Sequence, residues 1–225
     1  PRSAAQRGCG MMRAFSLAEA ARMTAGQCHD TAAEGLRYSG VSTDTRGIQP
    51  GDLFVALRGE NFDGHRFLDA ARSAGAVAAV VDTEQADVAL PQILVTDTVD
   101  ALAKLAAGNR SESSAHIVAV TGSSGKTTVR EMVASMLSEA GVTLATEGNL
   151  NNHIGVPLTL FRLAPEHQFG AIELGASGLG EIAHTVAITR PHVAILTNAG
   201  QAHLEGFGSY ENIVEAKGEI IDGVS

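Results

Sequence analysis

The chain has 225 residues, of which 44% are hydrophobic and 18% charged, and its formal net charge is −9. This composition excludes a disordered chain, and the length is sufficient for one or two folded domains. No cluster of Lys and Arg interleaves with aromatic residues, which argues against nucleic acid as a partner. No apolar run approaches the ~20 residues that cross a bilayer, and the N-terminus lacks an apolar signal core. We therefore expect a cytoplasmic protein without membrane insertion.

The first 96 residues carry signals for a small α/β domain. Residues 1–11 show no periodicity, and we expect a disordered leader there. Ser16 and Glu19 form a Ser-x-x-Glu pattern that predicts the start of a helix. The turn at 50–51 precedes an apolar strand at 53–57, and a polar loop, a helix over 67–74 and a strand over 78–81 follow. Cys9 and Cys28 are too few for a disulfide framework or a metal site.

Two interpretations apply to the polar residues around this strand. In the first, Asp44 and Arg46 are a surface ion pair and His65 is a cap or loop residue. In the second, a ligand pocket lies at the strand ends, Arg46 faces an anion, and the loop 63–65 closes over it. Considered by themselves, the residues favour the first interpretation.

A domain boundary is expected near residue 96. A short strand over 92–95 leads into a helix over 98–108, and the composition of residues 109–115 indicates a polar linker. We therefore divide the chain into an N-terminal domain over 12–96 and a second domain over 97–225.

The strongest signal in the second domain is the stretch 118–128. An apolar strand ends in a Gly/Ser turn, and the turn opens a helix expected over 129–140. Gly122 and Gly125 let backbone N–H groups turn toward a polyphosphate, Lys126 can reach the terminal phosphates, and Thr127 can ligate their Mg²⁺. The longer motif has a glycine where Val120 stands, so an ordinary Gly/Ser turn is the alternative. The flanking strand and helix favour a nucleoside triphosphate site in a doubly wound parallel sheet.

Further polar residues follow neighbouring strands. Three asparagines stand within 149–152, after a strand over 143–145, where they serve either a turn or a ligand. Glu173 lies in an apolar strand, where a carboxylate is costly unless it is paired or bound to metal, and a salt bridge is the alternative. His203 follows the strand 193–198 at the same edge of the sheet. The charges of the last helix, expected over 209–221, indicate only a solvated face.

Taken together, these stretches resemble the Mur ligase family, and the resemblance extends from residue 12 to residue 223. The residues that carry it are Asp44-Thr45-Arg46, Pro50-Gly51-Asp52-Leu53-Phe54-Val55-Ala56, Asp63-Gly64-His65, Thr121-Gly122-Ser123-Ser124-Gly125-Lys126-Thr127-Thr128, Gly148-Asn149-Leu150-Asn151-Asn152, Glu173-Leu174-Gly175-Ala176, 202–209 and Ala216-Lys217-Gly218-Glu219-Ile220. Two departures from the family pattern are Ser177 with Gly178, and His153.

The resemblance implies a fold and an activity. It implies a small uridine-nucleotide-binding α/β domain followed by an incomplete phosphate-loop domain. The activity would be ATP-dependent joining of D-alanyl-D-alanine to UDP-N-acetylmuramoyl-tripeptide in peptidoglycan synthesis. We expect a monomer, and we expect these 225 residues alone to be inactive, because the adenine contacts and the domain that brings D-alanyl-D-alanine would lie beyond Ser225.

The resemblance also implies roles for individual residues. ATP would be bound by Gly122, Ser123, Ser124, Gly125, Lys126, Thr127 and Thr128. The UDP-sugar substrate would be bound by Thr43, Asp44, Thr45, Arg46, His65, Asn149, Asn151 and Asn152. The catalytic residues would be Lys126, Glu173, His203 and Lys217. Two Mg²⁺ ions would be held by Thr127, Glu173, His203 and Lys217, the last as a carbamate formed with CO₂.

Three other functions stay open at this point. A related ligase that adds diaminopimelate or lysine is the nearest. A non-catalytic fragment that binds a UDP-sugar would show no nucleotide hydrolysis. A generic phosphate-loop NTPase or kinase would leave residues 44–46 and the asparagine cluster without a role.

Overall fold

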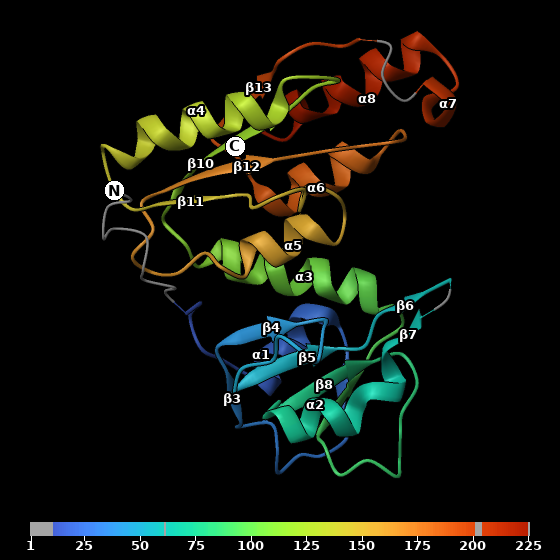
Figure 1. The fold of residues 1–225 in the computed structure, drawn as a ribbon. Coiled ribbons are helices and arrows are strands. Elements are labelled where there is room, and N and C mark those ends of the chain that lie inside the picture. The colour runs from blue at the N-terminus through green and yellow to red at the C-terminus, as the bar shows by residue number, and fades with distance from the viewer. Residues whose placement is uncertain (1–10, 61, 201–203, 225) are drawn as a thin grey trace.

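The computed structural model describes residues 11–60, 62–200 and 204–224, and the expected leader 1–11 lies almost wholly outside this part of the chain. Two sheets are stacked along the molecule, and the long helix α3 (Thr98–Ser111) lies between them (Figure 1). Helix α3 packs against α1 (Leu17–Thr24) of the first unit and against α5 (Gly155–Leu160) and α6 (Glu181–Thr189) of the second. No described helix combines the length and apolar character needed to cross a membrane.

The first sheet has five strands in the order β2-β9-β8-β5-β4. All neighbours are parallel except β2, which is antiparallel to β9. Alternate residues of the central strands face two cores: Leu53 and Val80 pack toward α1 and α3, whereas Phe54 and Val81 pack toward α2. The elements of this unit are β2 (Gln27–Cys28), β4 (Gly40–Ser42), β5 (Asp52–Val55), β8 (Ala78–Val81), β9 (Gln92–Leu94) and α2 (Leu68–Ala74).

Several elements of this unit confirm the sequence predictions. Helix α1 begins after Ser16, whose hydroxyl accepts from the Glu19 N–H while the Glu19 carboxylate accepts from the Ser16 N–H. Strand β8 has the predicted bounds. The polar loop after β5 contains more structure than expected, because β6 (Arg58–Gly59) pairs with β7 (Phe62–Asp63) and a 3₁₀ turn over Gly64–Phe67 precedes α2. The small antiparallel pair of β1 (Phe15–Ser16) and β3 (Arg37–Tyr38) was also not predicted.

The second sheet is fully parallel, with the order β11-β12-β10-β13. Its strands are β10 (His116–Thr121), β11 (Thr143–Ala145), β12 (Phe169–Glu173) and β13 (Val193–Leu196). Helix α4 (Lys126–Ser138) covers one face, and α5 and α6 lie on the other (Figure 1). Helix α8 (Tyr210–Asp222) packs on α6 and β13, after the short α7 (Leu204–Phe207).

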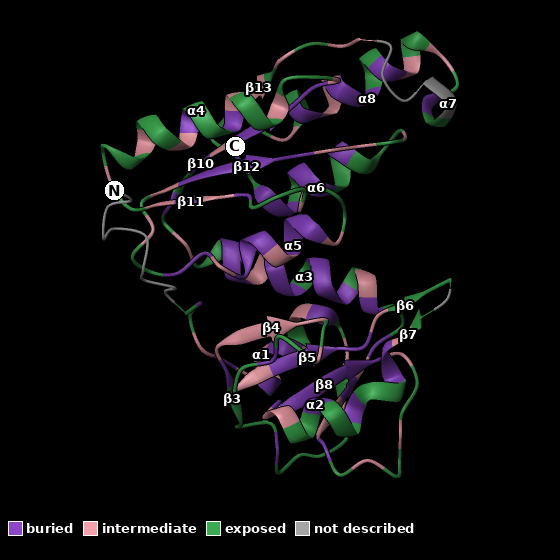
Figure 2. Cartoon of the chain, viewed as in Figure 1, coloured by how far each residue is buried: buried purple, intermediate pink, exposed green. Residues whose placement is uncertain are grey.

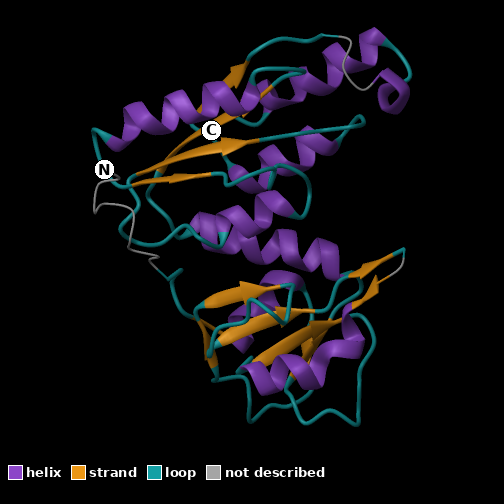
Figure 3. Ribbon diagram, in the orientation of Figure 1, coloured by secondary structure: helices purple, strands orange, loops and turns teal. Residues whose placement is uncertain are grey.

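Buried residues concentrate in the strands and along α3 and α5, as Figure 2 shows, and the loops stay exposed. Figure 3 shows how helices enclose the parallel strands of the second sheet. The central strands β10 and β12 are largely buried on both faces, which explains their continuous apolar runs, whereas the edge strand β13 is partly exposed.

The predicted start of one helix in this unit was wrong, and two further helices were not predicted. Helix α4 begins at Lys126 instead of 129, because Gly125 adopts a left-handed conformation (φ +78°) and ends the loop there. Helices α5 and α6 were not predicted, since both are short and α5 contains Pro157.

The predicted polar linker 109–115 was also partly wrong, because α3 continues to Ser111 and buries two polar side chains. Asn109 donates to the carbonyls of Leu160 and Leu163 at 2.9 and 3.0 Å. Arg110 donates to the carbonyls of Thr189 at 2.8 Å, Arg190 at 2.9 Å and Ser113 at 3.0 Å. Buried polar groups need such partners, so these residues attach α3 to the second unit.

We predict that Arg110→Ala lowers the free energy of unfolding by about 3 kcal/mol, because three backbone carbonyls lose their donor. Urea denaturation checks this. The control is Lys104→Ala on the same helix, which removes an exposed 2.7 Å ion pair with Asp100 and should cost about 0.5 kcal/mol or less. Equal effects of the two substitutions would contradict the role given to Arg110.

Candidate functional site

The loop between β10 and α4 lies at the carboxyl edge of the second sheet, the edge at which open α/β sheets bind ligands. Gly122 has φ +146°, and a Cβ there would lie 2.0 Å from the Thr197 hydroxyl. Gly125 caps α4 with φ +78°. Both positions thus require glycine, one for space and both for conformation.

Lys126 begins α4, and its Nζ donates to the Gly122 carbonyl at 2.8 Å, so the ammonium lies over the loop. The first N–H groups of a helix have no partner within the helix and carry partial positive charge. The loop, the helix start and the lysine therefore concentrate positive charge on one small surface of an acidic protein. This arrangement is suited to binding a polyphosphate.

A second segment, residues 197–200 after β13, holds the loop in place. Ser123 N–H donates to the Asn198 carbonyl at 3.0 Å, and the Thr197 hydroxyl donates to the Ser124 carbonyl at 2.7 Å. Sequence reasoning missed Thr197 and Asn198. The sequence analysis had placed both residues inside the strand 193–198, whereas β13 ends at Leu196 and leaves them in the loop.

Glu173 ends β12 beside this loop and is 2% exposed. Its Oε2 accepts from the Thr127 hydroxyl at 2.9 Å, and its Oε1 accepts from the Asn151 amide at 2.8 Å. Among the described residues, the one cation within 4 Å of this carboxylate is Arg130, whose Nε lies 3.9 Å from Oε2. A buried carboxylate without a close cation is costly.

The donor set around Glu173 fits Mg²⁺. A carboxylate and a hydroxyl are hard oxygen ligands, and they lie next to the polyphosphate loop as a nucleotide-bound Mg²⁺ requires. Within the described residues, no three His, Cys, Asp or Glu side chains gather into a metal cluster. His203, which we expected to be a further ligand, lies outside the described residues.

Lys217 on α8 is 2% exposed, and its Nζ donates to the Ala176 carbonyl at 3.3 Å and lies 5.3 Å from the centre of the Phe207 ring. Burial, together with the nearby Lys126 ammonium, lowers its pKa to about 8. Glu219 accepts from the N–H groups of Gly180 and Ala183 at 2.7 and 2.8 Å. The expectation that the charges of this helix form a solvated face was therefore wrong for Lys217, whereas Glu219 is partly exposed and Glu215 is exposed.

The three asparagines divide between the two roles considered for them. Asn151 contacts Glu173. Asn152 accepts from the N–H groups of Ile154 and Gly155 at 3.2 and 2.8 Å, which makes it a local turn residue at the start of α5. Asn149 is exposed, and its carbonyl accepts from Asn151 N–H at 2.8 Å.

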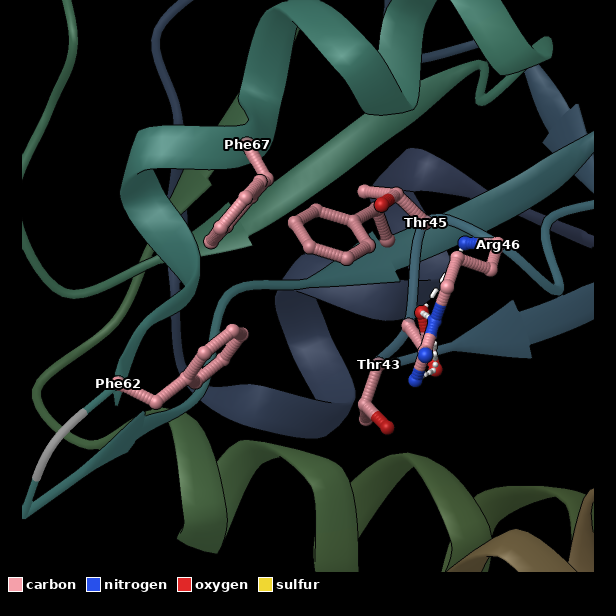
Figure 4. Close-up of a pocket in the computed structure, with 7 residues that line it drawn as sticks. Thr43, Thr45, Arg46, Phe62 and Phe67 are labelled. Carbon is pink, nitrogen blue, oxygen red and sulfur yellow. Dashed lines mark hydrogen bonds and ion pairs between the residues drawn. The ribbon is translucent and has the colours of Figure 1, made fainter.

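The first unit contains a cavity of about 430 Å³. The rings of Phe62 and Phe67 line it and stack at 5.4 Å with an interplanar angle of 12°. Figure 4 shows these rings on one side and the threonines and Arg46 on the other. The full lining is Thr43, Asp44, Thr45, Arg46, Phe54, Phe62 and Phe67.

Arg46 and Asp44 form a bidentate ion pair at this cavity, with Arg46 Nη2 2.5 Å from Asp44 Oδ2. The hydrogen bonds from Arg46 hold the pKa of Asp44 at about 2. The Arg46 side chain is 89% exposed. The Asp44–Arg46 ion pair of the first interpretation is thus present. Both residues also line the cavity that the second interpretation expected.

His65 does not line this cavity. Its Nδ1 lies 2.7 Å from Asp63 Oδ1, its Nε2 accepts from the Asp82 N–H at 3.2 Å, and its side chain is 3% exposed. Both ring nitrogens therefore have partners within the protein. This geometry favours the first interpretation, with His65 as a buried residue of the 3₁₀ turn and Asp63 as its cap, because Asp63 Oδ1 accepts from the His65 N–H at 3.0 Å.

We predict that Gly122→Ala destabilises the protein by about 1–3 kcal/mol, because the new Cβ collides with Thr197 in a backbone conformation that L-residues avoid. Thermal denaturation provides the measurement. Gly218→Ala is the matched control. A Cβ at Gly218, within α8, would meet no described atom within 4 Å apart from its neighbours along the helix. Because alanine favours the helix over glycine, this change should stabilise the protein by up to about 1 kcal/mol. A neutral Gly122→Ala would refute the close approach of the two loops.

Two family models match the chain: "Mur ligase family, catalytic domain" over residues 37–110 and "Mur ligase middle domain" over residues 120–225. The UDP-N-acetylmuramoyl-tripeptide–D-alanyl-D-alanine ligase of Escherichia coli (strain K12) is 55% identical over 189 residues, which are 84% of this chain and 42% of that protein. The ligase of the same name from Haemophilus influenzae is 47% identical, over 85% of this chain and 43% of that protein.

Solved structures also resemble the chain. A crystal structure of MurF from Acinetobacter baumannii matches with a TM-score of 0.90 at 40% identity, over 95% of this chain and 47% of that one. MurF ligase from Thermotoga maritima in complex with ADP matches with a TM-score of 0.77 at 39% identity, over 83% of this chain and 43% of that one. The chain thus spans less than half the length of each of these relatives. With both of its units matched by models of one family and both sheets found in solved members, the chain belongs to the Mur ligase family.

Proposed function

We propose that the protein to which this chain belongs is an ATP-dependent ligase that joins D-alanyl-D-alanine to UDP-N-acetylmuramoyl-tripeptide in peptidoglycan precursor synthesis. The observation that carries the proposal is the meeting of Lys126, Thr127 and the buried Glu173 at one sheet edge, in a chain that also holds a separate aromatic cavity. The names of the curated relatives support the choice of substrates. Such an activity would serve cell-wall biogenesis, and through it cell shape and division.

The reaction would have two steps. The terminal carboxylate of the tripeptide attacks the γ-phosphorus of ATP, so that an acyl phosphate forms and ADP leaves. The amine of D-alanyl-D-alanine then attacks the acyl carbon, loses a proton and displaces phosphate. The difficulty in the first step is the approach of two anions. Lys126 and the positive start of α4 would offset it, and such groups commonly contribute about 3 kcal/mol each.

Two Mg²⁺ ions would neutralise further phosphate charge. Thr127 and Glu173 would hold the first, with Asn151 keeping the carboxylate in orientation. His203 and a carbamate on Lys217 would complete the set. The MurF ligase of Thermotoga maritima was solved in complex with ADP, which supports the choice of nucleotide.

A carbamate on Lys217 is favoured by the setting of its amine. Only a neutral amine attacks CO₂, and the lowered pKa makes the neutral form of Lys217 accessible near pH 8. The conversion would replace a buried cation beside Lys126 by an anion. It would thereby remove a repulsion and create a metal ligand.

The uridine end of the substrate would occupy the cavity of the first unit. Phe62 and Phe67 offer apolar ring faces for a base, and Thr43 and Thr45 offer hydroxyl groups. Arg46 would meet the diphosphate after leaving Asp44. In this proposal His65 supports the cavity through the 63–67 turn and makes no contact with the substrate.

The remaining proposals concern partners and location. D-Alanyl-D-alanine and the adenine would be bound by parts of the protein outside these 225 residues. One chain supplies both described sites, which supports a monomer. Cytoplasmic location follows from the use of ATP and a UDP-sugar, both of which are cytoplasmic pools.

The ligase that adds diaminopimelate is the nearest alternative. One such enzyme structure matches with a TM-score of 0.59 at 20% identity, a likeness that shows the fold alone. Relatives that add D-alanyl-D-alanine are 37 to 55% identical, which is the observation that favours them. A substrate panel on the complete protein separates the two.

We predict that two substitutions in the complete protein impair different functions, one ATP turnover and the other UDP binding. Lys126→Ala should abolish ATP turnover, with a loss of at least about a hundredfold, and leave UDP binding intact. Phe62→Ala should weaken UDP binding about tenfold and leave ATP binding intact, since a stacked ring is worth about 1 kcal/mol or more. Isothermal titration with UDP and a phosphate-release assay provide the readouts. Near-normal turnover in Lys126→Ala would refute the assignment of the phosphate loop.

We also predict that Lys217 forms a carbamate whose amount increases with pH. A folded-state pKa of about 8, against 10.5 for ordinary lysine, favours the neutral amine roughly 300-fold at a given pH below 8. Below pH 8 the buried ammonium disfavours folding, and this cost is relieved as pH rises from 8 to 10.5.

The measurement is ¹³C NMR of the complete protein with ¹³C-labelled CO₂ at fixed concentration, from about pH 7 to 9, which spans the lowered pKa. The carbamate signal should grow over this range and vanish in Lys217→Arg. Lys104→Arg, at an exposed lysine, should retain the signal. A signal that survives Lys217→Arg, or that ignores pH, would contradict the prediction.

A further inference from the structure

Arg130 on α4 is a buried cation without a complete set of partners. Its side chain is 4% exposed, and its Nε has no hydrogen-bond partner among the residues that the structure describes. Buried donors of this kind are rare in folded proteins and costly, more so when they are charged. The position of Arg130, one turn after Lys126, makes this feature relevant to the site.

Two carboxylates lie on either side of this guanidinium. Arg130 Nη1 lies 2.6 Å from Glu131 Oε1, and the Glu131 side chain is 66% exposed. Arg130 Nε lies 3.9 Å from Oε2 of the buried Glu173, beyond hydrogen-bond distance. A small movement of the guanidinium would strengthen one contact at the expense of the other.

The same Glu173 oxygen also accepts from Thr127, the residue proposed to bind Mg²⁺. A divalent cation at Thr127 and Glu173 would neutralise the carboxylate and repel the guanidinium. Without the cation, the carboxylate keeps its charge and attracts the guanidinium. The two cations therefore compete for one buried carboxylate.

We propose that Arg130 is the resident counter-charge of Glu173, which balances the carboxylate before the divalent cation binds and then shifts its pairing to Glu131. The proposal rests on the proposed function, because it requires metal at Glu173. Arg130 is thus a positioning residue that sets the metal affinity of the site, and Glu131 is the acceptor that lets it withdraw.

This role predicts opposite signs for two neighbouring substitutions. Arg130→Gln removes the competing charge, so metal should bind more tightly. Glu131→Gln removes the alternative partner, so Arg130 should stay with Glu173 and metal should bind more weakly. An arginine that only held Glu173 in orientation would instead give weaker binding in Arg130→Gln and no change in Glu131→Gln.

The test measures the dissociation constant of Mn²⁺ in the complete protein with saturating ADP, by the loss of the free Mn²⁺ electron paramagnetic resonance signal. We expect a decrease of about tenfold in Arg130→Gln and an increase of about threefold in Glu131→Gln. Arg162→Gln is the matched control. Arg130, Glu131 and Arg162 line one cavity of about 530 Å³, and Arg162 pairs with Glu147 at 2.6 Å instead of with Glu173. The dissociation constant of Mn²⁺ in Arg162→Gln should equal that in the unmodified protein.

The outcomes separate the two proposals. If the unmodified protein does not bind Mn²⁺ with ADP, the proposed metal site fails and this inference fails with it. If the unmodified protein binds Mn²⁺ but Arg130→Gln weakens this binding, or Glu131→Gln leaves the binding unchanged, the inference about Arg130 alone is overturned. Should Arg130→Gln fail to fold, the exposed Glu131→Gln still decides the question by its sign.

Discussion

The parallel pairing of β10 with β12 on one side and β13 on the other is the constraint on which the site depends. Val120 lies opposite Glu173 in the β10–β12 register, and Thr121 lies opposite Leu196 in the β10–β13 register. Three segments distant in sequence therefore end at the same height of one sheet edge. The phosphate loop, the buried carboxylate and the 197–200 segment owe their proximity to this register, since a shift of one residue would turn Glu173 to the other face.

Three cations gather around the site. Lys126 lies over the Gly122 carbonyl, Lys217 is buried close enough for the Lys126 ammonium to lower its pKa, and Arg130 lies between two carboxylates. In a chain of net charge −9, positive charge is concentrated where a polyphosphate would bind.

Helix α3 connects the helices α5 and α6 of the second unit to the first unit. Its apolar face packs on α1, and Asn109 and Arg110 at its end donate to carbonyls of the segments around α5 and α6. The aromatic cavity and the phosphate loop thus belong to units that share one helix. A two-site enzyme with a long substrate, bound at its nucleotide end and reacting at its peptide end, suits this arrangement.

The sequence by itself determined the central strands of both sheets, the capping box at Ser16, the Gly/Ser loop between β10 and α4 and the exceptional acid in β12, because each of these is a local pattern. The resemblance to the family then suggested roles for residues such as Lys217, which the charges of α8 alone did not indicate, and these roles stay proposals. Only the tertiary structure decided which polar residues meet. Asn151 contacts Glu173, whereas Asn152 accepts from backbone N–H groups in the turn before α5. His65 lies inside its own turn, and Thr197 and Asn198 contact the loop. It also decided that Arg110 and Lys217 are buried. The physical reason is that burial and side-chain pairing depend on contacts between residues tens of positions apart, and such contacts leave no periodic trace along the chain.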